Sequence, residues 1–204
     1  MATFTINFVN NSSSSGSFCV FQQNHNSPNP DVFPLAWRVE SAAPHTQLAI
    51  SWNTDLYFFW AKTGELRPGV IFYPGENAPT DLTGRNQITL IKEERDYKFA
   101  NQQDWHQQGS LCIISANTTA IRQASVGIGM SGVPTVAVQA QPNMNFVFTP
   151  RFEYWITFGN LKQGQVLDPS EINSPVKIEF PYGIFSMNAT LNADNTWTIT
   201  QGID

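Results

Sequence analysis

The chain has 204 residues, of which 41% are hydrophobic, and its formal net charge is −5 at pH 7. This length is enough to bury a large core, so we expect a single β-sandwich domain over residues 1–204. Only 13% of the residues are charged, about half the share found in an average globular protein. The sequence has no Lys or Arg run, which argues against nucleic-acid binding. The weakly charged surface favours a homo-oligomer.

The N-terminal segment lacks the basic and apolar regions of a signal peptide. No apolar run reaches the ~20 residues that a transmembrane helix needs. We therefore expect a protein without a transmembrane segment that is cytoplasmic, or exported without an N-terminal signal peptide. Cys19 and Cys112 lie in apolar, strand-like runs and have no metal-ligand spacing. We interpret them as free buried thiols, although the sequence leaves a disulfide open.

Apolar and polar residues alternate with a period of two along the whole chain, from residues 4–8 at the start to residues 196–200 at the end. This alternation is typical of half-buried antiparallel strands. Residues 57–60 and 154–158 are apolar on both faces, which indicates central strands or strands whose outer face is covered.

Turn residues separate these runs at short intervals. Residues 192–195 lie between two strand-like runs and predict a closing hairpin. Gly127, Gly129 and Gly132 fall in or beside a strand-like segment, where glycine indicates a bulge, a bend or a close backbone approach. The best helical candidate is a single turn at residues 168–172. The sequence therefore predicts an all-β fold, an antiparallel two-sheet sandwich or jelly roll with very little helix.

Catalytic and metal-binding patterns are missing from the sequence. His25, His45 and His106 lie in polar, loop-like settings without metal-ligand spacing. We therefore predict no catalytic residue, no metal and no cofactor. An enzyme with a loop-assembled acid/base or metal site remains an alternative, with Glu153, Asp168 and one histidine as its candidates.

The first candidate for ligand contact is Trp105-His106. Both residues lie in the polar, amide-rich stretch of residues 101–109. A tryptophan in such a loop often contacts a partner, because its ring is apolar and its indole N–H can donate a hydrogen bond.

The second candidate is the stretch from Arg151 to Trp155. Glu153 stands at the head of an aromatic strand, where its carboxylate could polarise a ligand or pair with Arg151 at the rim. Tyr154 and Trp155 offer stacking faces for sugars and other flat ligands. Most aromatic residues of a strand-rich chain fill the core, so these two could do the same.

Several stretches carry a family resemblance. They are Asn10-Asn-Ser-Ser13, Gly16-Ser-Phe-Cys-Val-Phe-Gln22, Pro34-Leu-Ala-Trp37, and residues 123–132, 139–143, 148–156 and 189–197. In these stretches the chain resembles the RhiA-like, rhizosphere-expressed proteins of root-nodule bacteria and their relatives. The resemblance implies a bacterial protein whose expression is tied to cell density or host association. It brings no established reaction and no catalytic residues.

The favoured hypothesis is a non-enzymatic binding or interaction protein that recognises a carbohydrate or another polar small ligand. The enzyme described above is one alternative. A self-associating structural protein, or one that acts at a host or membrane surface, is another. Exposed aromatic side chains grouped at one end of the sandwich would favour this last class.

Overall fold

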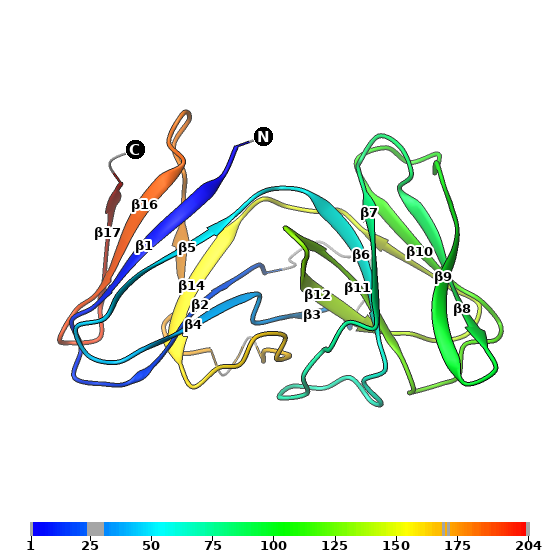
Figure 1. The fold of residues 1–204 in the computed structure, drawn as a ribbon, viewed down its shortest axis with the longest axis horizontal. Helices are drawn as coiled ribbons and strands as arrows, with labels where there is room; N and C mark the ends of the chain where they lie inside the picture. Colours follow the sequence, from blue (N-terminus) through cyan, green and yellow to red (C-terminus); the bar gives the residue numbers. More distant parts are fainter. Residues whose placement is uncertain (1, 24–30, 169, 171, 203–204) are drawn as a thin grey trace.

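The computed structural model describes residues 2–23, 31–168, 170 and 172–202, which form strands and no helix (Figure 1). The strands are β1 (Phe4–Asn10), β2 (Gly16–Phe21), β3 (Phe33–Pro34), β4 (Arg38–Ala42), β5 (Gln47–Trp52), β6 (Leu56–Ala61), β7 (Glu76–Thr80), β8 (Gln87–Glu93), β9 (Asp96–Gln103), β10 (Leu111–Ser115), β11 (Ser125–Met130), β12 (Val133–Gln139), β13 (Met144–Phe148), β14 (Tyr154–Gly159), β15 (Val176–Ile178), β16 (Ser186–Leu191) and β17 (Trp197–Gln201). No helix that could cross a membrane occurs in this described part of the chain.

Four sheets make two lobes that lie side by side (Figure 1). In the first lobe, sheet A (β17-β16-β1-β5) faces sheet B (β15-β14-β2-β4). The Phe8 and Phe18 rings stack between these sheets with centroids 4.5 Å apart. In the second lobe, sheet C (β3-β12-β11-β6-β7) faces sheet D (β13-β10-β8-β9). The Trp60 and Tyr97 rings meet between these two sheets at 5.9 Å.

The predicted all-β sandwich class is confirmed, but the sheets are more numerous than the two expected. They are also not purely antiparallel, because β1 pairs with β16 and β8 pairs with β10 in parallel. Local alternation shows that a segment is a strand, but it carries no information on the direction of the neighbouring strand. One continuous hydrophobic cluster contains residues of both lobes. The single-domain boundary stays a prediction.

Trp37, between β3 and β4, holds the two lobes together. Its ring is fully buried and meets the Trp52 ring at 5.3 Å. Its indole Nε1 donates a hydrogen bond of 3.3 Å to the backbone oxygen of Met130 in the second lobe. The neighbouring Arg38 Nη2 donates to the backbone oxygen of Ser131 at 2.9 Å. These contacts bury the junction, so the lobes share one packed interface.

Several local predictions are confirmed. The segments at 57–60 and 154–158 lie in β6 and β14, which have strand neighbours on both sides. The predicted closing hairpin joins β16 to β17. The irregularity that the glycines predicted is a shift in the β11–β12 register between Ile128 and Gly129. Residues 169 and 171 of the expected helical turn lie outside the described residues.

The two thiols are free and buried, on β2 of the first lobe and β10 of the second. Burial raises the pKa of the Cys19 thiol, and it raises the pKa of Cys112 to about 11. Because the thiolate is the reacting form, we expect both cysteines of the native protein to resist a disulfide reagent at pH 8. Both should react promptly in denaturant, which serves as the control. Fast modification of the native protein would contradict this burial.

Candidate functional site

Exposed aromatic side chains gather at one end of the first lobe. Phe152 is 47% exposed, Phe185 is 40% exposed and Tyr182 is fully exposed. Phe4 and Phe180 lie beside them, partly buried. We call these five residues the aromatic end.

Phe4 anchors the aromatic end to the core. It begins β1 of sheet A, and its ring meets Phe180 at 5.0 Å and Phe185 at 5.6 Å. On its inner side it meets Tyr154 at 5.9 Å and stacks on Trp52 at 6.2 Å. The exposed rings therefore rest on a packed aromatic core, which holds them in place.

Two neighbouring hollows open at the aromatic end and share Phe4 and Phe180. One, of about 310 Å³, also has Glu153 and Lys177 in its lining. The other, of about 510 Å³, is formed largely by the loop from Phe180 to Phe185. Each volume lies within the range of about 300–1,000 Å³ that small-molecule sites occupy.

A three-residue ion network borders the first hollow. Lys177 Nζ lies 3.3 Å from Glu153 Oε1 and 3.3 Å from Glu179 Oε1. Hydrogen bonds from the ammonium to Glu153 and Glu179 raise the pKa of Lys177 above its ordinary value. The network therefore carries one net negative charge, and its polar atoms remain partly exposed beside the aromatic rings.

Tyr154 lies beneath this surface, between sheets A and B. Its hydroxyl and the indole Nε1 of Trp52 are both buried without a hydrogen bond of regular geometry among the described residues. Burial raises the pKa of Tyr154, and the nearby indole N–H of Trp52 offsets part of that rise. Tyr154 therefore stays neutral and supports the hollow from below.

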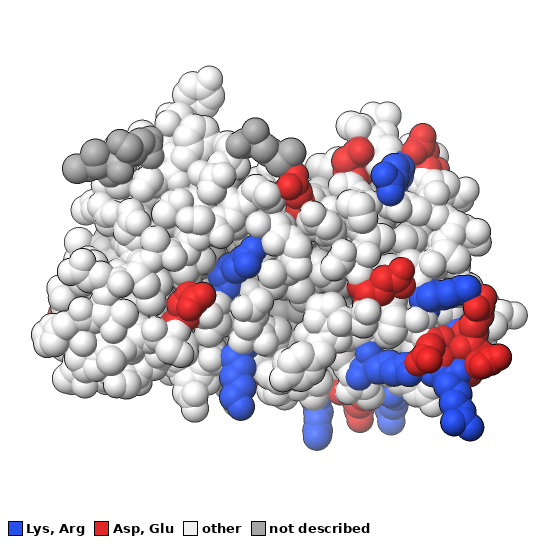
Figure 2. Space-filling model, in the orientation of Figure 1, with Lys and Arg blue, Asp and Glu red and all other residues white. Residues whose placement is uncertain are grey.

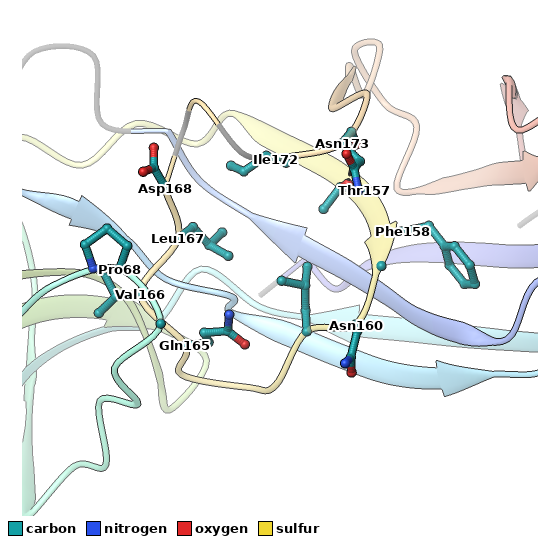
Figure 3. A pocket seen from close by; sticks show the side chains of 13 residues that line it. Pro68, Thr157, Phe158, Asn160, Gln165, Val166, Leu167, Asp168, Ile172 and Asn173 are labelled. Atoms are coloured by element: carbon teal, nitrogen blue, oxygen red, sulfur yellow. Dashed lines mark hydrogen bonds between the residues drawn. The ribbon is translucent and has the colours of Figure 1, made fainter.

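A separate cleft of about 320 Å³ lies on the other face of sheet B (Figure 3). It is bounded by the end of β14, by the loop that follows it, and by Pro68 and Gly69 of the second lobe. Figure 3 shows the Phe158 ring turned away from this cleft, and that ring packs on Phe18 at 5.1 Å.

Three polar side chains of the cleft are already engaged within the chain. Thr157 Oγ1 donates to the backbone oxygen of Asn173 at 2.6 Å, and Gln165 Oε1 accepts from the backbone N–H of Lys162. Asp168 accepts two hydrogen bonds from Ser170, which lower its pKa. The cleft offers no free ring face, because the Phe158 ring packs on Phe18, so the aromatic end is the stronger candidate for stacking a ligand.

The structure brings only part of the predicted site together. Glu153 and Tyr154 line the same hollow, and Glu153 forms an ion pair with Lys177. Trp155 points to the opposite face of sheet B and packs against the cluster of Cys19, Phe21, Ala36 and Leu167. Arg151 is exposed, and its backbone oxygen accepts from Gln22 Nε2 at 2.7 Å.

Trp105 and His106 lie on the second lobe, between β9 and β10, and so belong to a different surface. Their rings meet edge to face at 5.0 Å, with Trp105 half-buried and His106 exposed. The backbone N–H of Trp105 donates to the buried Asn86 side chain at 2.7 Å. A contact role for this pair stays a prediction that is independent of the aromatic end.

The acids proposed for the enzyme alternative are not neighbours. Glu153 lines the aromatic end, whereas Asp168 lines the cleft on the other face of sheet B. His25 lies outside the described residues, and His106 is on the second lobe. Across residues 2–23, 31–168, 170 and 172–202, no group of three His, Cys, Asp or Glu side chains could hold a metal ion.

Several important residues of the site were not predicted from the sequence, among them Lys177, Glu179, Tyr182 and Phe185. Tyr182 and Phe185 lie in a loop, Phe180-Pro-Tyr-Gly-Ile-Phe185, whose proline and glycine interrupt the strand pattern. Large apolar residues in a turn are unusual, because turns lie on the surface. That mismatch is the signal that could have revealed them.

Fold and site together define an all-β protein of two sandwich lobes with an aromatic surface at one end. The family model for RhiA matches residues 1–202, and the chain belongs to the RhiA family. It is 33% identical to Protein RhiA of Rhizobium leguminosarum bv. viciae, over 96% of this chain and 85% of that protein. The family resemblance of the sequence is thus confirmed. No solved structure matches the chain significantly.

Proposed function

We propose that the protein is a non-enzymatic binding protein that recognises a carbohydrate at the aromatic end. The observation that supports this is the placement of exposed rings, Phe152 and Tyr182, around hollows bordered by Glu153, Lys177 and Glu179. A sugar ring has an apolar face that stacks on aromatic rings. Its hydroxyl groups exchange hydrogen bonds with carboxylates and ammonium groups, which fix its orientation.

The charge at this end narrows the ligand class. The Glu153–Lys177–Glu179 network has one net negative charge, which repels acidic sugars and tolerates neutral ones. We therefore propose a neutral glycan as the ligand. We propose that this recognition occurs in a bacterial, density- or host-related setting, which the family resemblance supports.

A glycan array followed by isothermal titration with the best neutral glycan tests the proposal. Tyr182→Ala should weaken binding by about 2- to 10-fold, the loss expected for one aromatic contact. Glu153→Gln should weaken it by about 10-fold or more, because a charge-assisted hydrogen bond is lost. Tyr73→Ala, which removes another exposed tyrosine on the second lobe, is the matched control and should bind normally. An array without any bound glycan would overturn the proposal.

A second candidate function is docking onto a lipid surface through the same end, the class that exposed aromatic side chains grouped at one end favour. It is favoured by the stretch from Phe180 to Ala193, which holds no charged residue and includes the exposed Tyr182 and Phe185. Aromatic residues prefer the interface between water and lipid, where their rings sit at the level of the headgroups. This end has no basic patch, so docking would not require anionic lipid and should occur on zwitterionic lipid as well.

Co-sedimentation with phosphatidylcholine vesicles separates the two candidates. Lipid docking predicts that the wild type pellets with vesicles, whereas a Tyr182→Ser/Phe185→Ser variant stays in solution. Tyr73→Ser again serves as the control for loss of an exposed ring. Wild-type protein that remains in the supernatant at high lipid would eliminate lipid docking and leave glycan binding as the function to test.

A further inference from the structure

Strand β17 presents an open edge of sheet A. It pairs only with β16 in the sheet order, and it lies at the outer side of the first lobe (Figure 1). The backbone N–H of Gly202 donates to the oxygen of Ser186, and that of Asn192 donates to the oxygen of Thr196. Because backbone groups alternate along a strand, those of Trp197, Ile199 and Gln201 point away from the β16 backbone. The Gln201 oxygen also accepts a hydrogen bond from Asn188 Nδ2 at 3.1 Å, which uses one of its two lone pairs.

The β17 edge lacks the features that normally prevent strands of two molecules from pairing. Proteins protect open edges with charges, prolines and bulges. Among the other edge strands, β4 carries Arg38 and Glu40, β7 carries Pro79, and β9 has a register shift, whereas β5 and β13 also lack charge and proline. The sequence of β17, WTITQ, has neither charge nor proline, and its pairing with β16 is regular.

The strands around β17 are also free of charge, although Asp194 lies in the turn that precedes β17. None of the four strands of sheet A contains an Asp, Glu, Lys or Arg residue. On the face seen in Figure 2, charged side chains are more numerous on the second lobe than on the first. Two copies that approach through β17 therefore meet little electrostatic repulsion, even though each chain has a net charge of −5.

The sequence of β17 is complementary to itself in the antiparallel direction. With Ile199 opposite Ile199 of a second copy, Trp197 faces Gln201 and Thr198 faces Thr200. In this register the outward backbone groups of Trp197, Ile199 and Gln201 form hydrogen bonds with the same residues of the second copy. The side chains of these three residues lie on one face of the joined sheet, and those of Thr198 and Thr200 lie on the other. We propose that two copies of the chain pair through β17 about a two-fold axis, so that their A sheets become one continuous sheet.

This pairing is isologous and closes at two copies. The opposite edge of sheet A, β5, is also uncharged. Pairing of β17 with β5 of another copy would instead be head-to-tail and would build an open chain of molecules. β5 contacts β4 of the facing sheet, which hinders such pairing and leaves β17 as the more accessible edge.

Sedimentation velocity on the full chain, combined with hydrogen exchange, tests the proposal. The wild type should sediment at twice the monomer mass, with the amides of Ile199 and Gln201 protected. Gln201→Pro removes an outward N–H and should give a monomer. Ser51→Pro alters the equivalent position on β5 and should leave the dimer intact. Unchanged far-UV and near-UV circular dichroism shows that each variant is folded.

Three outcomes would overturn the proposal. The first is a wild type that stays monomeric at all accessible concentrations. The second is a dimer in which the Ile199 amide exchanges freely, since another surface must then hold it. The third is dissociation by Ser51→Pro as well as by Gln201→Pro, which would indicate head-to-tail pairing. A thermal unfolding scan of both variants guards against mistaking loss of the fold for loss of the interface.

Discussion

Replacing Trp37 with alanine is expected to lower the free energy of unfolding by about 3–5 kcal/mol, the cost of deleting a large buried aromatic side chain. Trp37 is fully buried at the junction of the lobes, where its ring stacks against Tyr154 at 6.1 Å. The substitution opens a cavity there and also leaves the backbone oxygen of Met130 without its indole donor. Urea unfolding followed by circular dichroism measures the loss.

Trp105→Ala is the matched control for this prediction. It deletes the same side chain from a half-buried position in the β9–β10 loop, so we expect a loss of about 1 kcal/mol or less. Equal effects of the two substitutions would contradict the assignment of Trp37 to the buried junction.

The second large effect is expected for Gly129→Ala in β11. A Cβ atom at Gly129 would lie 2.1 Å from the backbone oxygen of Val133 and 2.5 Å from Pro134 Cα. Backbone atoms cannot rotate out of the way as a side chain can, so the β11–β12 pair must separate. We expect a loss of about 1–3 kcal/mol or more in the free energy of unfolding, measurable as a lower midpoint in urea.

Gly159→Ala provides the comparison on β14. A Cβ atom at Gly159 meets no atom within 4 Å, so we expect no loss, or a gain of about 0.4–1 kcal/mol from reduced freedom of the unfolded chain. If both alanine variants were equally stable, β12 could not lie as close to β11 as the structure places it.

The all-β class could be predicted because each strand carries its own signature. Alternating residues marked the half-buried strands of sheet A, and doubly apolar segments marked the central strands β6 and β14. The arrangement into four sheets could not be predicted in this way. It depends on pairs such as Thr5 with Ser186, and nothing in the local pattern of either residue identifies the other.

The candidate site was only partly predictable for a related reason. Glu153 could be predicted as a candidate from its aromatic neighbours in the sequence. Its ion-pair partner Lys177 could not, because it lies in β15, far away in the sequence. Tyr154 and Trp155 are adjacent in sequence yet point to opposite faces of sheet B, so only Tyr154 reaches the aromatic end. The exposed rings of Tyr182 and Phe185 come from a third segment.

The path of the chain through the two lobes has a consequence for folding during synthesis. Apart from the short β3, the second lobe is built from the continuous stretch β6 to β13, whereas the first lobe needs β1, β2, β4 and β5 together with β14 to β17. Parallel pairing of β1 with β16 closes nearly the longest loop that the chain allows, and contacts of such high order form slowly. As the chain leaves the ribosome, the second lobe can therefore fold first. One edge of β1 then stays unpaired until β16 has been synthesised, and during this interval the nascent protein is most prone to aggregation.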